Sequence, residues 1–172
     1  ILPFWTSYLA RTFSWMAILK GKGVLEWVFT QLGLPYTSIL YTDIAVILGF
    51  VHVFLPLMIL PILSSMRNLD KTLIDAARDL GARTLSVIRH VILPLTYPGV
   101  IVGVILVFIS TFGSFVTPLL LGGADDIMIG NVVERNFSVV FDWPFGSAVG
   151  TVMLAIIMAI LLLSRKYLSI RV

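Results

Sequence analysis

The sequence predicts an all-α, polytopic membrane protein. Of its 172 residues, 59% are hydrophobic and 12% are charged, whereas soluble domains average about 45–50% apolar and about 25% charged residues. The mean hydropathy is +1.04, and the apolar residues gather into long uncharged runs. A bilayer core about 30 Å thick needs about 20 apolar helical residues to cross it. Runs of this length and composition indicate membrane spans.

Four segments reach or approach the length of a span. Residues 44–63, 99–121 and 145–164 carry no formal charge, and residues 1–19 are interrupted only by Arg11. A charge in hydrocarbon costs at least about 2.5 kcal/mol, so Arg11 is expected to face other helices or water. A structural arginine bonded to a neighbouring helix and a role in a translocation path are both compatible with its position.

Prolines and glycines lie inside two of the predicted spans. The second span contains Pro56 and Pro61, and the third contains Gly103, Gly113 and Pro118. Each frees backbone groups that only neighbouring helices or a wet cavity can satisfy within a membrane. This favours a transporter, although kinked helices also occur in membrane proteins that move nothing.

The remaining composition narrows the kind of protein further. The absence of cysteine and the isolation of His52 and His90 predict no metal site; His52 is expected to be a helix-packing hydrogen-bond donor. The sequence contains no basic segment interleaved with aromatic residues, so nucleic acid is not an expected partner. The apolar segment 24–34 is too short to span a membrane and is expected to form an interfacial or pore-capping helix. Because Ile1 opens directly into apolar sequence, we expect residues 1–172 to form one transmembrane domain that is N-terminally incomplete.

The distribution of basic residues predicts the orientation, because lysine and arginine collect in short cytoplasmic loops. Eight basic residues fall in the 64–92 connection and the C-terminal tail: Arg67, Lys71, Arg78, Arg83, Arg89, Arg165, Lys166 and Arg171. Lys20, Lys22 and Arg135 fall on the opposite side. The 64–92 connection and the C-terminus are therefore predicted to be cytoplasmic.

The connection between residues 67 and 94 is patterned as a helix–turn–helix elbow outside the membrane. Asp70 is a natural N-cap, and Gly81 can end a helix in the left-handed conformation. An apolar face is predicted between them from the spacing of Leu69, Leu73, Ala76, Ala77 and Leu80. A second helix carrying Leu85, Ile88, Val91 and Ile92 is expected to continue toward Pro94. Periodicity alone allows two roles, a docking face for a protein partner or an amphipathic helix resting on anionic lipid.

The motif within this elbow resembles the EAA loop of binding-protein-dependent ABC importer permeases. It consists of Asp75-Ala76-Ala77, Gly81, Val91 and Leu93-Pro94, with aspartate in place of the usual first glutamate and valine in place of the usual isoleucine. The resemblance implies a coupling helix that sits in a cleft of an ATPase subunit. The residues it assigns to coupling are Asp75, Ala76, Ala77, Leu80, Gly81, Leu93 and Pro94.

The likeness extends over nearly the whole chain, to spermidine/putrescine permeases of the PotB type. It is carried by Leu2-Pro3-Phe4-Trp5-Thr6-Ser7, Arg11, Trp15, Leu40-Tyr41-Thr42, Ala45-Val46, Leu121-Gly122-Gly123-Ala124, Ile129-Gly130-Asn131 and Asp142-Trp143-Pro144-Phe145-Gly146. That family normally has six spans, and the four predicted here match its last four. The resemblance implies the transmembrane domain of a type I ABC importer, which passes polyamines from an extracytoplasmic binding protein to the cytoplasm.

The same resemblance implies the partners: two ABC ATPase subunits, a second related permease, a substrate-binding protein and the inner-membrane bilayer. The chain has no G-x-x-x-x-G-K-[ST] phosphate loop. It is therefore not expected to be an enzyme or to hold a cofactor, and ATP with its magnesium is expected on the partner ATPase.

The substrate path is predicted from charge and aromatic residues. Six acids are predicted outside: Glu26, Asp43, Asp125, Asp126, Glu134 and Asp142. They would concentrate polycations by electrostatic focusing, with Glu134, Asp142 and Trp143 best placed to receive them. Phe108 and Phe112, with Phe115, could line a passage for a methylene chain. Solvated loop charge and a lipid-facing or interhelical aromatic stripe are the alternatives.

Two other classes of membrane protein are compatible with parts of the sequence. An ion-coupled secondary transporter would need intramembrane acids, and the uncharged spans contain none. A scaffold that binds a cytoplasmic ATPase without transporting a solute would keep the elbow but leave the broken spans unexplained. An importer of the same class for another small solute is also compatible.

Overall fold

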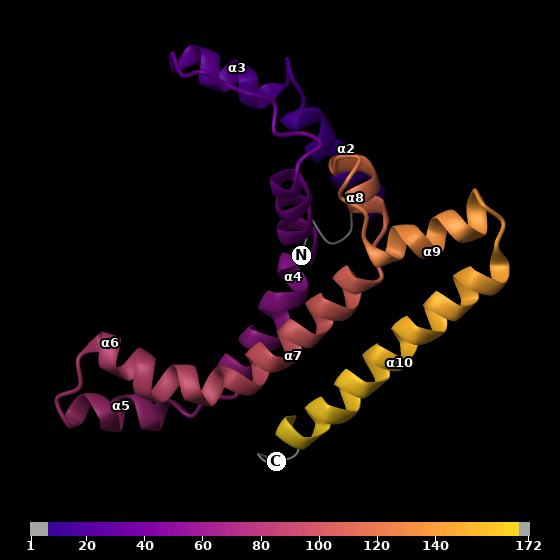
Figure 1. Cartoon of the computed structure of the whole chain (residues 1–172). Helices are drawn as coiled ribbons and strands as arrows, with labels where there is room; N and C mark the ends of the chain where they lie inside the picture. The colour runs from indigo at the N-terminus through magenta and orange to yellow at the C-terminus, as the bar shows by residue number, and fades with distance from the viewer. Residues whose placement is uncertain (1–6, 169–172) are drawn as a thin grey trace. The chain divides into compact units, whose positions relative to one another are not determined.

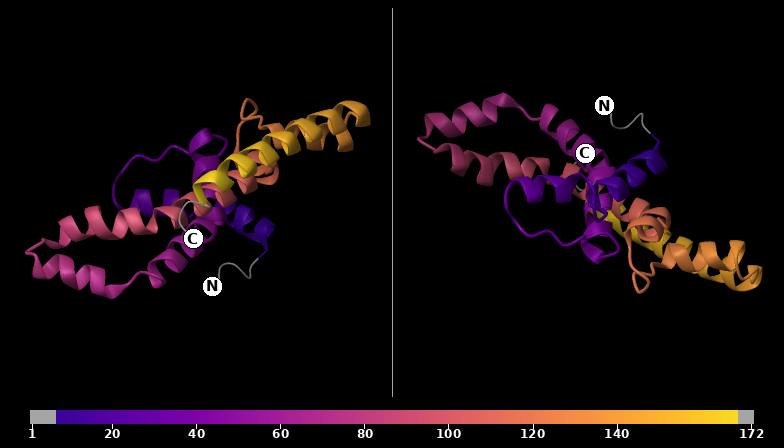
Figure 2. Two further views of the ribbon diagram at one scale, coloured as in Figure 1. Left: turned by 90° about the horizontal axis from the view of Figure 1, so that it is seen from below. Right: turned by 90° about the horizontal axis from the view of Figure 1, so that it is seen from above.

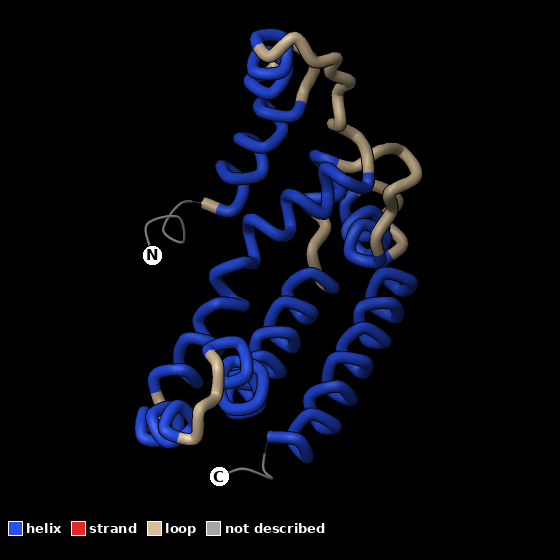
Figure 3. The backbone as a smooth tube through the Cα atoms, turned by 90° about the vertical axis from the view of Figure 1, so that its left-hand side faces the viewer, coloured by secondary structure: helices blue, strands red, loops and turns tan. Residues whose placement is uncertain are grey.

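The computed structural model describes residues 7–168, and helices joined by loops make up all of that part (Figure 3). The helices in chain order are α2 Tyr8–Leu19, α3 Val24–Gln31, α4 Asp43–Arg67, α5 Lys71–Asp79, α6 Thr84–Val87, η1 Ile88–Ile92, α7 Leu93–Phe112, α8 Val116–Leu121, α9 Ile129–Ser138 and α10 Trp143–Leu168 (Figure 1). The all-α prediction is confirmed.

The chain divides into two compact units. The first consists of residues 1–55 and 109–157, and the second of residues 56–108 and 158–172. The long helices α4, α7 and α10 each contribute to both units.

Three helices are long and apolar enough to cross a membrane. They are Asp43–Arg67, Thr84–Phe112 and Trp143–Ser164. The first and third confirm the spans predicted at residues 44–63 and 145–164. In the apolar stretch of each helix, at most 22% of the residues are buried within the chain. Helices that remain this apolar and this uncovered are typical of a protein whose remaining contacts are lipid or other subunits.

The third predicted span, residues 99–121, is wrong in its bounds. The helix begins at Thr84 and ends at Phe112, and α8 starts after a break at Gly113–Phe115. At the break the Ser114 amide donates to Thr111 O at 3.1 Å, an i to i−3 bond that tightens the last turn of α7. The uncharged run continues through this break, so hydropathy alone does not reveal it.

The first predicted span lies partly outside the described residues. The described part, α2, has 12 residues, and residues 1–6 are not described. A crossing by residues 1–19 therefore stays a prediction. The short helix expected within residues 24–34 is confirmed as α3, after which Gly33 takes φ +69°.

Prolines inside α4 and α7 do not end these helices. Pro56 and Pro61 lie within α4, and Pro98 lies within α7. In the second unit, α7 packs on α4 through two glycines. A Cβ at Gly99 would lie 2.6 Å from the Pro61 carbonyl oxygen, and one at Gly103 would lie 2.7 Å from Met58 Sδ. Such close approach requires glycine, as helix contacts in membranes often do.

The core of the first unit joins α2, α4 and α8. The buried cluster consists of Leu19, Leu40, Ala45, Val46 and Leu121. At Gly49 of α4, a Cβ would lie 2.6 Å from Leu121 Cδ1 and 2.9 Å from Thr117 Cγ2. The α4 and α8 backbones therefore approach closely, because residue 49 has no side chain.

Two polar contacts join α2 to α4 in the same unit. The Arg11 guanidinium donates to Val53 O at 3.4 Å, which confirms a bond to a neighbouring helix. The indole N–H of Trp15 donates to His52 Nδ1 at 3.0 Å. The prediction that His52 is a donor is wrong for this contact, because a tryptophan N–H can only donate and the imidazole must accept.

Candidate functional site

The 67–94 elbow is built by α5, α6 and η1 in the second unit. The α5 helix runs beside α6 and η1, as both views of Figure 2 show. The predicted N-cap is confirmed, because Asp70 Oδ1 accepts from the Thr72 amide at 2.9 Å. The predicted turn is also confirmed, with Gly81 at φ +81°. The Ala82 amide donates back to Ala77 O at 3.1 Å and closes the end of the helix.

One face of α5 is not covered by the rest of the chain. Leu80 is 89% exposed at the end of the helix, and Leu73 is 47% exposed. Ala76 lies between them and is exposed, whereas Ala77 is half-buried. Successive residues of a helix turn by about 100°, so positions 73, 76 and 80 share one face. This apolar strip, Leu73–Ala76–Leu80, lies on an exposed part of a helix whose other positions carry the charged Lys71, Asp75, Arg78 and Asp79, and it has the composition of a small docking face.

The elbow passes into a candidate span without a break. The residues from Thr84 to Phe112 form one continuous helix, composed of α6, η1 and α7. The predicted coupling residues Leu93 and Pro94 begin α7 and are exposed. The elbow and the candidate span are therefore joined by helical backbone and not by a loop.

A π-helical turn at Ile88–Ile92 was not predicted from the sequence. Pro94 supplies a physical reason. A proline ring inside a helix clashes with the carbonyl of the residue four positions earlier, here His90. A wider turn relieves that clash, and π turns are frequent at functional positions. The Thr96 hydroxyl donates to Ile92 O at 2.9 Å and supports the junction with α7. Pro94 was the signal that could have indicated the irregularity.

The Asp70 cap makes the elbow sensitive to acid. The Thr72 amide holds the pKa of Asp70 below its ordinary value of 3.8. A carboxylate with a lowered folded-state pKa stabilises the fold above its unfolded pKa, and this stabilisation is lost as the pH falls through the folded value. We expect the hydrogen-exchange protection of residues 71–80 to fall below about pH 4. The Asp70→Asn variant keeps a capping oxygen that does not titrate, so its protection should not change over this range; equal loss in both proteins would contradict the prediction.

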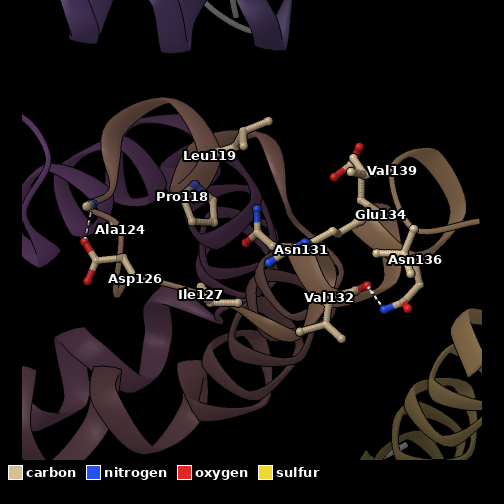
Figure 4. Close-up of a pocket in the computed structure, with 13 residues that line it drawn as sticks. Pro118, Leu119, Ala124, Asp126, Ile127, Asn131, Val132, Glu134, Asn136 and Val139 are labelled. Atoms are coloured by element: carbon tan, nitrogen blue, oxygen red, sulfur yellow. Dashed lines mark hydrogen bonds between the residues drawn. The ribbon is translucent and has the colours of Figure 1, made fainter.

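A second candidate site is a pocket of about 600 Å³ in the first unit, on α8, α9 and their connection (Figure 4). Its charged lining residues are Asp126, Glu134 and Arg135. The hydrogen bonds from the Asp43 side chain and from the Gly123 amide hold the pKa of Asp126 below its ordinary value. Carboxylates kept ionised in this way attract cations.

Of the five residues predicted for a substrate path, only Glu134 lines this pocket. Its Oε1 accepts from Ser138 Oγ at 2.5 Å. Asp142 instead accepts from the Phe145 amide at 3.1 Å and caps the start of α10. Trp143 packs edge-on against Phe137 with the ring centroids 6.1 Å apart.

The two predicted phenylalanines lie elsewhere. Phe112 is the last residue of α7, and Phe108 belongs to the second unit. Asp142, Trp143, Phe108 and Phe112 are thus not among the residues that line the pocket with Glu134. Their role in a substrate path stays a prediction.

Comparison with known proteins identifies what this arrangement is similar to. Residues 36–172 match the family described as binding-protein-dependent transport system inner membrane component. The chain is 42% identical to a spermidine/putrescine transport system permease protein PotB of Haemophilus influenzae over 100% of its own length and 62% of that protein's. It is 43% identical to the PotB of Escherichia coli over 95% of its length and 60% of that protein's.

A more distant relative is named for another substrate. It is a putative 2-aminoethylphosphonate transport system permease protein of Salmonella typhimurium, 35% identical over 70% of this chain and 42% of that protein. The chain spans about three-fifths of the length of the PotB relatives it matches.

The matched region holds the elbow, the three candidate spans and the pocket on α8 and α9. The chain belongs to the family of binding-protein-dependent transport system inner membrane components.

Proposed function

We propose that this chain is a membrane-spanning part of an ATP-driven importer for polyamines. It would work with two ATPase subunits, a second permease and an extracytoplasmic binding protein. The observation that carries the coupling role is the continuous helix from the elbow into a candidate span, Thr84–Phe112. Two relatives that match over 95% or more of this chain's length are named for spermidine and putrescine, which supports the substrate class.

The proposed mechanism starts at the strip Leu73–Ala76–Leu80. An ATPase cleft would cover this strip, with Asp75 and Gly81 fixing the orientation and geometry of the helix. Closure of the ATPase dimer would displace the elbow and, through η1 and Leu93–Pro94, the span that follows. The spans would then switch between an inward-facing and an outward-facing arrangement. This switch requires that the two arrangements of the permease be close in free energy. ATP and magnesium would stay on the ATPase.

The proposed orientation places the elbow and the C-terminus in the cytoplasm, following the excess of basic residues there. The pocket on α8 and α9 would then be an outer pocket that faces the binding protein. Its carboxylates, Asp126 and Glu134, outnumber its one guanidinium, from Arg135. This imbalance favours a cationic solute over an anionic one.

The test is the ATPase activity of the complete complex in lipid nanodiscs with its binding protein. Spermidine and putrescine are expected to stimulate ATP turnover, and 2-aminoethylphosphonate is expected to have no effect. Stimulation by 2-aminoethylphosphonate alone would keep the importer and discard the polyamine substrate. No stimulation by any solute, with the ATPase still bound, would favour a scaffold without transport.

A further inference from the structure

The break between α7 and α8 opens onto a cavity of about 330 Å³ in the first unit. It shares no lining residue with the outer pocket, and of the residues named for the substrate path it contains only Phe115. The lining residues are uncharged: Tyr8, Phe54, Ser110, Gly113, Ser114, Phe115 and Val116. Phe54 lies near the middle of α4, a candidate span. Transporters often bind their substrates at such depths, beside discontinuous helices.

Hydroxyl groups supply the polar part of this cavity. The Tyr8 hydroxyl lies 2.8 Å from Ser114 Oγ and 2.6 Å from Thr117 Oγ1. Thr117 is fully buried, and Ser114 is 9% exposed. Each hydroxyl has one proton to donate and two lone pairs that accept. A linked chain of hydroxyls therefore keeps more acceptors than donors, which suits a ligand that only donates.

Aromatic rings supply the apolar part. Tyr8 stacks on Phe54 with the ring centroids 6.5 Å apart, and Phe54 stacks on Phe50 at 5.8 Å. Phe115 lines the cavity as well. The faces of such rings attract a cation and also accommodate methylene groups.

The end of α7 adds a third feature that favours a cation. The helix stops at Phe112, and the negative end of its dipole lies at the lining residues that follow. The geometry of this break is held in place by α9. Asn131 Nδ2 donates to Phe115 O at 2.9 Å, and a Cβ at Gly130 would lie 2.6 Å from Ser114 O. Ser114 and Phe115 are therefore positioned before any ligand arrives.

We infer that the cavity at the α7–α8 break binds an aliphatic ammonium group of the transported solute, through the Tyr8 and Ser114 hydroxyls and the Tyr8, Phe54 and Phe115 rings. This inference rests on the proposed polyamine function and assigns part of its path. The absence of charge among the lining residues suits passage, because a transported ion must bind well enough to enter and weakly enough to leave. An ion pair would hold a polyamine more tightly than hydroxyls and rings do.

A single-cysteine experiment tests the site directly, since the sequence contains no cysteine. In the complete complex turning over ATP, Ser114→Cys is expected to react with 2-aminoethyl methanethiosulfonate, as detected by the mass of this chain. Spermidine at about ten times its half-maximal concentration should slow the reaction about tenfold, because occupied sites are protected. The matched control is Ser14→Cys, on the exposed side of α2, where spermidine should not change the rate.

Two results distinguish the site from the proposed function. If spermidine stimulates ATP turnover but does not protect Ser114→Cys, the site is wrong and the polyamine importer stands. If spermidine fails to stimulate the wild-type complex, the substrate and the inference both fail.

The Tyr8→Phe variant gives a second test, since it keeps the ring and removes only the hydroxyl. Because a hydrogen bond to a charged group strengthens binding, its loss should lower spermidine uptake about tenfold. Ser14→Ala, which removes a hydroxyl bonded to Ala10 O of its own helix, should transport at the wild-type rate. Uptake by Tyr8→Phe equal to that of Ser14→Ala would overturn the assignment.

Discussion

Replacing Ala76 with glutamate should release the ATPase from the permease complex and leave membrane insertion intact. Ala76 is exposed at the centre of the strip Leu73–Ala76–Leu80, so the new side chain disturbs no packing within the elbow. Burying an unpaired carboxylate in the proposed interface would cost about 3 kcal/mol or more, which is about a hundredfold in the dissociation constant. The measurement is the amount of ATPase that co-purifies with the permease in detergent.

Two controls separate the docking face from a general effect of charge. Lys71→Gln lowers the net charge by the same amount as Ala76→Glu, at a position about 140° around α5. Ala76→Ser changes the same position without adding a charge or much volume. Both variants should retain the ATPase. If Ala76→Glu also retains it, the strip is not the contact surface, and an amphipathic helix lying on lipid becomes the better interpretation.

Replacing Gly81 with valine should weaken ATPase binding through the backbone alone. Gly81 has φ +81°, and no heavy atom lies within 4 Å of where its Cβ would be. A clash with a neighbour is therefore excluded, and the cost comes from the left-handed conformation. That cost is about 1–2 kcal/mol for an ordinary residue, which corresponds to about tenfold weaker retention of the ATPase.

The same position offers a graded series as its control. Asparagine tolerates the left-handed region better than other residues do, and β-branched residues tolerate it worst. Retention should therefore decrease in the order glycine, asparagine, alanine, valine. Equal retention by Gly81→Asn and Gly81→Val would show that the turn is not needed in this conformation.

The local structure of the elbow could be predicted from short-range sequence patterns. Asp70 as N-cap, the helix that follows and the left-handed Gly81 were all predicted, because each depends on residues within one or two turns. The spans at residues 44–63 and 145–164 were predicted for a similar reason, since hydropathy records where a helix can lie in hydrocarbon. The coupling residues were assigned by resemblance, and their docking role stays a prediction.

The break at Gly113–Phe115 shows where local patterns fail. Hydropathy treats residues 99–121 as one uncharged run, yet the helix ends at Phe112. The residues that hold the break open, Gly130 and Asn131, come from a later helix and contact Ser114 and Phe115. A hydropathy average over about 19 residues centred on the break does not include these two residues.

The sequence by itself thus determined the helical class, two of the spans and the shape of the elbow, all of which depend on composition and short-range geometry. Only the tertiary structure decided that the elbow and the next span form one helix, with a π turn before Pro94. It alone brought Tyr8 to Ser114 across 106 residues of sequence. The physical reason is that a cavity belongs to the packing of several helices, and no single helix encodes the positions of the others.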